Sequence, residues 1–160
     1  MKERGFTLIE TLIYSALTTL IVTFAILTTY SMIDSADRVR NQKELVDNQK
    51  LLTQKIYYTL QSVSAINSPG IGATSTTLSV DKVGYGSNPV VVNTASSVAW
   101  LKRGASAAQP ITDTFYAQVQ SLSFHQYDFS GHPAIQVTGS LFNPYTSTTV
   151  AVGTTTIIVK

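Results

Sequence analysis

Glu10 is the residue whose position most needs a chemical explanation. It stands at the start of an apolar stretch, because Thr11 to Ile33 runs for 23 residues without a charged side chain. As a helix, a stretch of about 20 apolar residues crosses a hydrocarbon core of about 30 Å. A carboxylate at the centre of a bilayer costs on the order of 2.5–3.5 kcal/mol on insertion scales, so an acidic residue in a span indicates a function.

The helix that contains Glu10 offers it no partner nearby. The next cationic side chain along the chain is Arg38, almost eight turns away at ~3.6 residues per turn. An unpaired charge in lipid is costly, and the cost falls when the charge is paired. The partner of Glu10 must therefore be sought outside its own stretch of helix.

The residues before Glu10 form a pattern of their own. A short basic leader, Met1-Lys2-Glu3-Arg4, is followed by Gly5-Phe6-Thr7-Leu8-Ile9-Glu10 and then by the apolar stretch. This order resembles the class III signal sequence of type IV pilins and type II secretion pseudopilins. The resemblance implies that a prepilin peptidase cuts after Gly5 and methylates the new N-terminal residue, Phe6.

The same resemblance implies a partner for Glu10. In this family the glutamate at the fifth mature position pairs with the N-terminal ammonium of a neighbouring subunit, so Phe6 and Glu10 are the expected assembly residues. An α-amino group has a pKa near ~7.7–8.0 and is largely cationic at neutral pH, and methylation does not remove that charge.

Two other interpretations of this segment stay open. Thr7-Leu8-Ile9-Glu10 has the form of a capping box, in which the Thr hydroxyl and the Glu carboxylate bind the first amides of a helix. An ordinary secretory signal peptide has an apolar region of only ~7–15 residues and a small-residue cleavage site. A capping box does not explain the preceding glycine and basic leader, and the apolar region here is too long for a signal peptide.

The composition is that of one domain with an anchor. Of the 160 residues, 44% are hydrophobic and 12% are charged, about half the ~25% that is usual. The net charge of +2 leaves no basic surface of the kind that binds nucleic acid, so no nucleic-acid partner is expected. There are no cysteines, so no disulfide holds the fold. Many major type IV pilins have a C-terminal disulfide, and its absence favours a minor pilin or pseudopilin.

A long helix is expected in the first part of the chain. No proline or glycine occurs between Phe6 and Asn67, and the composition changes from apolar to amphipathic at Asp34. Asn67 to Gly72, which contains a proline and two glycines, is expected to end the helix. The second part carries an apolar stripe made of Leu45, Leu52, Ile56, Leu60 and Val63.

The remainder of the chain has the pattern of β-strands. β-Branched residues and alternation dominate, and Gly104 to Pro110, Ser130 to Pro133 and Asn143 to Ser147 are expected to be turns. Successive strands without helices between them favour antiparallel pairing. The expected strands are Thr77–Val80, Val83–Tyr85, Val90–Asn93, Ser97–Lys102, Tyr116–Asp128, Ile135–Leu141 and Thr148–Val159.

We therefore expect an α+β protein with a long N-terminal helix packed on an antiparallel β-sheet domain. This is the architecture for which the pilin family is known. The expected parts are a leader (1–5), a transmembrane and assembly helix (6–33), an amphipathic helix (34–66) and a β-rich globular domain (67–160). The order of segments in the second half also resembles the J-type minor pseudopilins and W-type minor pilins.

No enzymatic or metal chemistry is expected elsewhere. His125, Asp128 and His132 lie within eight residues, but their spacing fits no familiar zinc pattern. Without cysteine, and with no other histidine, no nucleophilic triad can be assembled. The calcium site of the major pseudopilin is not carried over, because Asp113 and Asp128 do not cluster with other acids.

Trp100, Lys102 and Arg103 form a candidate binding patch, although such a tryptophan is more often part of a core. We expect no catalytic residue, no cofactor and no metal.

The resemblance implies a structural subunit of a type IV pilus or type II secretion-type filament. Its expected partners are other pilin or pseudopilin subunits, the prepilin peptidase, the inner-membrane assembly platform and the lipid bilayer. The basic residues on the two sides of the span are nearly balanced and decide little about its orientation. The resemblance implies a single-pass protein of the cytoplasmic membrane with its C-terminal domain outside, and later a filament in the periplasm or at the cell surface. A membrane-anchored binding module that does not polymerise is the alternative.

Overall fold

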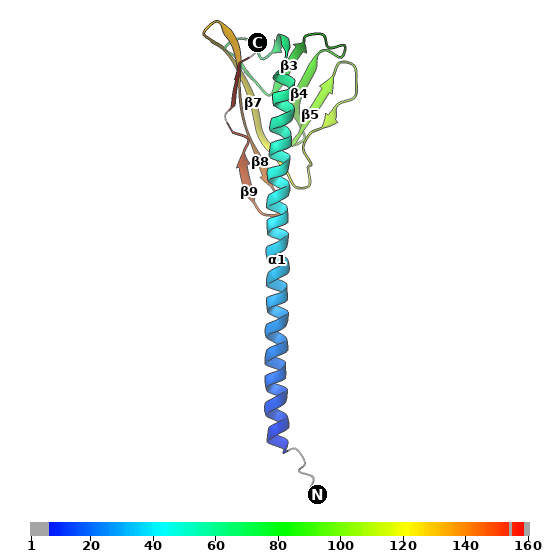
Figure 1. Ribbon diagram of the computed structural model, residues 1–160, viewed down its shortest axis with the longest axis vertical. Helices are drawn as coiled ribbons and strands as arrows, with labels where there is room; N and C mark the ends of the chain where they lie inside the picture. The colour runs from blue at the N-terminus through cyan, green and yellow to red at the C-terminus, as the bar shows by residue number, and fades with distance from the viewer. Residues whose placement is uncertain (1–6, 154, 159–160) are drawn as a thin grey trace. The chain divides into compact units, whose positions relative to one another are not determined.

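The computed structural model describes residues 7–153 and 155–158 (Figure 1). The chain divides into two compact units, Met1–Arg40 and Asn41–Lys160. A helix, α1 (Leu8–Leu60), begins in the first unit and ends in the second. All of the described strands belong to the second unit.

The second unit consists of the end of α1 and two five-stranded sheets. One sheet has the order β1-β3-β4-β5-β6, and the other has the order β10-β8-β7-β2, with β9 also paired to β8. All pairs between named strands are antiparallel. The strands are β1 (Val63–Ser68), β2 (Thr74–Ser75), β3 (Thr77–Lys82), β4 (Val90–Ala95), β5 (Val98–Arg103), β6 (Gln109–Pro110), β7 (Gln118–Phe129), β8 (His132–Asn143), β9 (Thr148–Ala151) and β10 (Thr155–Ile158).

Two tight turns set the register of the main hairpins. Ser96 and Ser97, between β4 and β5, both have positive φ, at 52° and 60°. Ser130 and Gly131, between β7 and β8, have φ of 55° and 82°. Two-residue loops with positive φ at both positions match the right-handed twist of the strands that they join.

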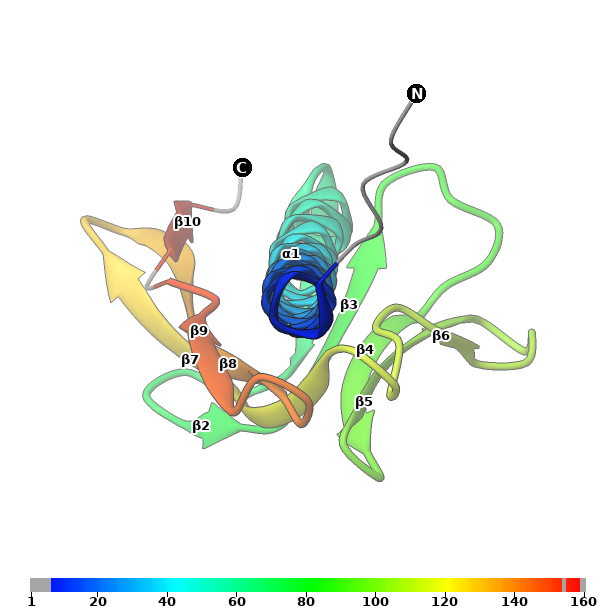
Figure 2. The ribbon, with the colours of Figure 1, turned by 90° about the horizontal axis from the view of Figure 1, so that it is seen from below.

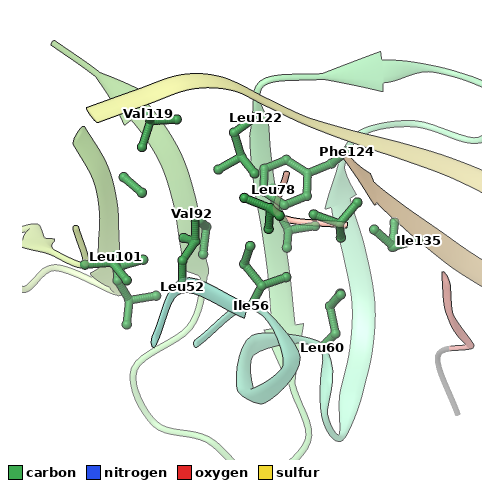
Figure 3. Close-up of a cluster of buried hydrophobic side chains, with 14 of the residues drawn as sticks. Leu52, Ile56, Leu60, Leu78, Val92, Leu101, Val119, Leu122, Phe124 and Ile135 are labelled. Atoms are coloured by element: carbon green, nitrogen blue, oxygen red, sulfur yellow. The ribbon is translucent and has the colours of Figure 1, made fainter. Parts of the chain in front are cut away.

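The core of the second unit forms where the helix stripe meets both sheets. Residues 41–60 of α1 lie between the two sheets (Figure 2). Leu52, Ile56 and Leu60 of the helix belong to one buried cluster (Figure 3). One sheet contributes Leu78 and Val92 to this cluster, and the other sheet contributes Phe124. Leu45, Leu52, Leu78, Val92 and Phe124 are completely buried. Each leucine buried in this way contributes about 1.5–3 kcal/mol of transfer free energy, so the stripe fixes the helix to the sheets.

The expected fold class is confirmed, since a long N-terminal helix packs against antiparallel sheets. The prediction that the helix extends to residue 66 was wrong. The helix ends at Leu60, Ser62 has a φ of 54°, and Val63–Ser68 form β1. The segment contains no proline or glycine that would stop a helix, but it pairs with β3 and therefore forms a strand.

Several strand predictions also need correction. Val83–Tyr85 form a turn, because Gly84 has a φ of 65° and the Tyr85 N–H donates to the Lys82 carbonyl over 3.4 Å. Gln109–Pro110, expected within a turn, pair with β5. The expected C-terminal strand is two strands, since Gly153, with a φ of 85°, separates β9 from β10. Val159 lies outside the described residues.

Gly139 is required by a bulge in the β7–β8 hairpin. The pairing register shifts between Val119 and Ser121, which turns both Val119 and Leu122 into the core. Gly139 pairs with Leu122, and a Cβ at this position would lie 2.8 Å from the Ser121 carbonyl oxygen. A backbone oxygen in a paired strand cannot move away without breaking the ladder.

Gly139→Ala is therefore expected to lower the free energy of unfolding by about 1–3 kcal/mol, the range seen for overpacked sites. The measurement is urea unfolding of the full chain in detergent, followed by the fluorescence of Trp100. Gly86→Ala is the matched control, because a Cβ there meets no atom within 4 Å. Equal midpoints for the two variants would contradict this account of the bulge.

Lys82 closes the end of α1. Its ammonium donates to the Tyr58 carbonyl oxygen over 2.7 Å and lies 3.9 Å from the centre of the Tyr58 ring. Only 8% of the residue is exposed. A cation is favourable here because the last carbonyls of a helix lack partners and carry the negative end of its dipole.

Replacing Lys82 with methionine removes this bond while keeping most of the side-chain volume. We expect Lys82→Met to destabilise the second unit by about 1.5–3 kcal/mol, the range for hydrogen bonds to charged groups. Lys102→Met, at an exposed position on β5, should change the unfolding free energy by no more than about 0.5 kcal/mol. A Lys82 variant as stable as the Lys102 variant would show that the contact carries no net stability.

Candidate functional site

Glu10 lies in the first turn of α1, with Thr7 as the N-cap. The Thr7 carbonyl accepts the backbone N–H of Glu10 over 3.1 Å and that of Thr11 over 3.2 Å. The Thr7 hydroxyl also accepts the Glu10 N–H, over 3.4 Å. An acidic residue in the first turn is favoured by the positive end of the helix dipole.

The capping box is only half formed. Its second half would be a bond from the Thr7 N–H to the Glu10 carboxylate, and no such bond exists among the described residues. In the same part of the chain Glu10 makes no ion pair, while Arg38 binds Asp34 over 2.9 Å. The Glu10 carboxylate is therefore not used by its own helix, and its side chain is partly exposed.

Seven of the eight serine and threonine hydroxyls of the apolar stretch bond to carbonyls of their own helix. Each of seven serine and threonine hydroxyls from Thr11 to Thr29 donates to a carbonyl three or four residues earlier, at 2.8 or 2.9 Å. A hydrocarbon environment demands such internal pairing, because no water is present to replace it. These seven hydroxyls therefore bond back to their own helix and do not depend on a neighbouring helix.

The apolar side chains around these hydroxyls are exposed. An 18-residue window of α1 has a mean hydropathy of 1.9, and none of it is buried. Within the described residues, α1 is the one helix long and apolar enough to cross a membrane. Leu8, Phe24 and Ile33 illustrate the exposure, at 82%, 70% and 55%. Such a surface needs lipid or other apolar helices as its surroundings.

Gly5 and Phe6, the expected processing residues, lie outside the described residues. The structure therefore places only Glu10 among the three residues that the sequence singled out. The structure adds that the Glu10 carboxylate, at the start of the helix, has no ion-pair partner within the described part of the chain.

The other candidate sites are placed as follows. His125 shares a 3.0 Å hydrogen bond with the Thr74 hydroxyl, and the Asp128 carboxylate accepts the Gly131 N–H over 2.7 Å. His132 pairs with Phe129 at the tip of the hairpin. The described residues contain no group of three side chains able to hold a metal ion, neither here nor around Asp113.

Trp100 does not form a patch with both basic neighbours. Its indole N–H donates to the Ala95 carbonyl over 3.2 Å, and its ring lines an open cavity of about 620 Å³ beside Leu51 and Pro110. Alternation along β5 places Lys102 on the same face as Trp100 and Arg103 on the other.

Comparison with known proteins agrees with the N-terminal signal. Residues 1–26 match the family model of the prokaryotic N-terminal methylation motif. No curated protein and no solved structure matches the chain. Together with the long apolar helix packed on sheets, the motif supports a protein of the type IV pilin-like class, with features of a membrane-anchored prepilin. The match ends within the apolar stretch and does not address the J-type or W-type subtype.

Proposed function

We propose that this protein is a structural subunit, a minor pilin or pseudopilin, of a type IV pilus or type II secretion-type filament. The observation that carries the proposal is the carboxylate of Glu10. It stands unpaired in the described structure, at the start of an exposed apolar helix, inside a segment that matches the methylation motif. Such a helix end is suited to meet a cationic terminus from another subunit.

Processing creates that cationic terminus. A prepilin peptidase would cut between Gly5 and Phe6 and methylate the amino group of Phe6. The ammonium stays charged after methylation and would meet the Glu10 carboxylate of a neighbour. Because desolvation offsets much of the attraction in a buried ion pair, this pair contributes register between subunits more than net stability.

The driving force for assembly comes from the apolar helix. Its large apolar side chains from Leu8 to Ile33 are exposed in the single chain, and seven of its serine and threonine hydroxyls already bond to the helix. Helices of this kind associate through van der Waals packing once they leave lipid for a bundle of similar helices. Other pilin or pseudopilin subunits are therefore the proposed partners, together with the inner-membrane assembly platform.

The second unit supplies the surface outside the membrane. We place it on the extracytoplasmic side, with the leader in the cytoplasm. The absence of cysteine and the order of strands favour a minor subunit of the J or W type.

Gly5→Ala tests the processing step. Because the peptidase must fit the residue before the cut, the variant should accumulate as the full-length chain, while the parent protein loses residues 1–5 and gains a methyl group. Intact-mass measurement of protein from a cell that has the peptidase distinguishes the two. Gly70→Ala, in a loop where a Cβ meets no atom within 4 Å, should be cut normally. An unmethylated, uncut parent protein would favour the anchored module that does not polymerise.

Glu10→Val tests the register between subunits. Removing one member of a buried ion pair costs about 3–5 kcal/mol, so incorporation into filaments should fall by about a hundredfold or more at equal expression. The measurement is the ratio of filament-bound to membrane-bound protein in the host that assembles it. Asp37→Val, an exposed acid further along α1, is the control and should be incorporated nearly as well as the parent protein. Equal incorporation of both variants would sink the register role.

A further inference from the structure

Three aromatic side chains form a cluster at the surface of the second unit. The ring centres of Phe115 and Tyr116 are 4.8 Å apart, those of Phe115 and Tyr145 are 4.9 Å apart, and those of Tyr116 and Tyr145 are 6.0 Å apart. Phe115 and Tyr145 are each 55% exposed. Three rings in contact that remain open to solvent are an unusual feature of a surface and indicate a binding face.

The two segments that carry the cluster are fixed to the first helical residues of the second unit. The Asp113 N–H donates to the Asn48 side chain over 3.0 Å. The Asn143 side chain donates to the Asn41 carbonyl over 3.0 Å, and Asn143 is completely buried. The cluster is therefore held at the end of this unit where its share of α1 begins.

That end of the unit is the one closest along the chain to the proposed membrane span. The uncharged stretch ends at Ile33, and Asn41 is eight residues later. Eight residues span about 12 Å as a helix and about 26 Å when fully extended. The segment that carries Tyr145, bound at Asn41, is therefore separated along the chain from the end of the span by this short connection only.

We propose that Phe115, Tyr116 and Tyr145 insert into the membrane–water interface of the bilayer while the protein is anchored, before it enters a filament. This proposal rests on the membrane anchoring included in the proposed function. Aromatic rings with a polar tip favour this layer, because the ring leaves water while the hydroxyl stays hydrated. Tyr116 and Tyr145 each have such a ring and such a hydroxyl, and Phe115 adds apolar area in contact with both tyrosines.

The surroundings of the cluster favour a neutral lipid surface over an electrostatic partner. The segments 114–120 and 143–147 contain no charged side chain. Between Asp34 and Asp47 the helix carries four acidic and three basic residues, a net charge of −1. Binding is therefore expected in zwitterionic lipid, without the need for anionic headgroups.

The sequence makes a direct test possible, because Trp100 is its single tryptophan. In a Trp100→Phe background, Tyr145→Trp places a lone reporter in the cluster, and Phe115→Trp provides a second one in case the first disturbs the fold. The full chain is reconstituted at low density in phosphatidylcholine vesicles whose acyl chains are brominated near the headgroup. Circular dichroism shows that each variant keeps its sheets.

The expected result is quenching of the reporter at position 145 or 115 by the brominated lipid, at least about twofold stronger than that of a Tyr57→Trp reporter in the same background, because Tyr57 is exposed near the last turn of α1, away from the cluster. Adding anionic lipid should leave this ratio unchanged. Quenching no stronger than that of the reporter at position 57 in both folded variants would overturn the proposal. So would protection from a water-soluble quencher without quenching by lipid, since a second copy of the chain would then cover the cluster.

Phe24→Trp in the same background separates this proposal from the proposed function. Phe24 lies within the apolar stretch, so bromine near the chain ends should quench it whether or not the cluster touches lipid. If this reporter is quenched and those of the cluster are not, the anchoring holds and the interfacial cluster is refuted. If the reporter at position 24 is not quenched either, anchoring and the inference fail together.

Discussion

The structure depends on one helix that meets two different environments. Up to Ile33 its apolar side chains are exposed on every side, and from Leu45 to Leu60 the buried ones follow a single stripe. The first pattern requires apolar surroundings all round, and the second requires a core on one side only. Two sheets supply that core, since Leu52 and Ile56 lie with side chains from both of them.

Polar contacts fix the second part of the helix in register with the sheets. The Lys82 ammonium binds the last turn at Tyr58, while the Asn48 side chain accepts the backbone N–H of Asp113 much earlier along the helix. Apolar packing is not directional, so it tolerates sliding along the helix axis. Hydrogen bonds at both ends of the stripe remove that freedom, because each bonded group would lose its partner after a shift of one turn.

The two ends of the helix differ in how their polar groups are bonded. Lys82 binds a carbonyl of the last turn, whereas the first turn contains a carboxylate without a partner among the described residues. Thr7 caps the first amides, yet the Glu10 carboxylate stays unpaired within the described residues. Hydroxyl groups further along the apolar stretch, such as Thr23, bond back to the helix and need no neighbour. In the proposed filament, Glu10 would set the register between subunits, and the rest of the stretch would pack by shape.

By itself, the sequence determined the apolar span, the exceptional position of Glu10 and the α+β class, because these follow from composition and periodicity within short segments. Only the tertiary structure decided that the helix ends at Leu60, since pairing between β1 and β3 competes with helix formation there. It also decided that the strands form two sheets, and that Phe115 meets Tyr145 from a distant segment. Such pairings depend on contacts between residues far apart in the chain, which no local pattern encodes.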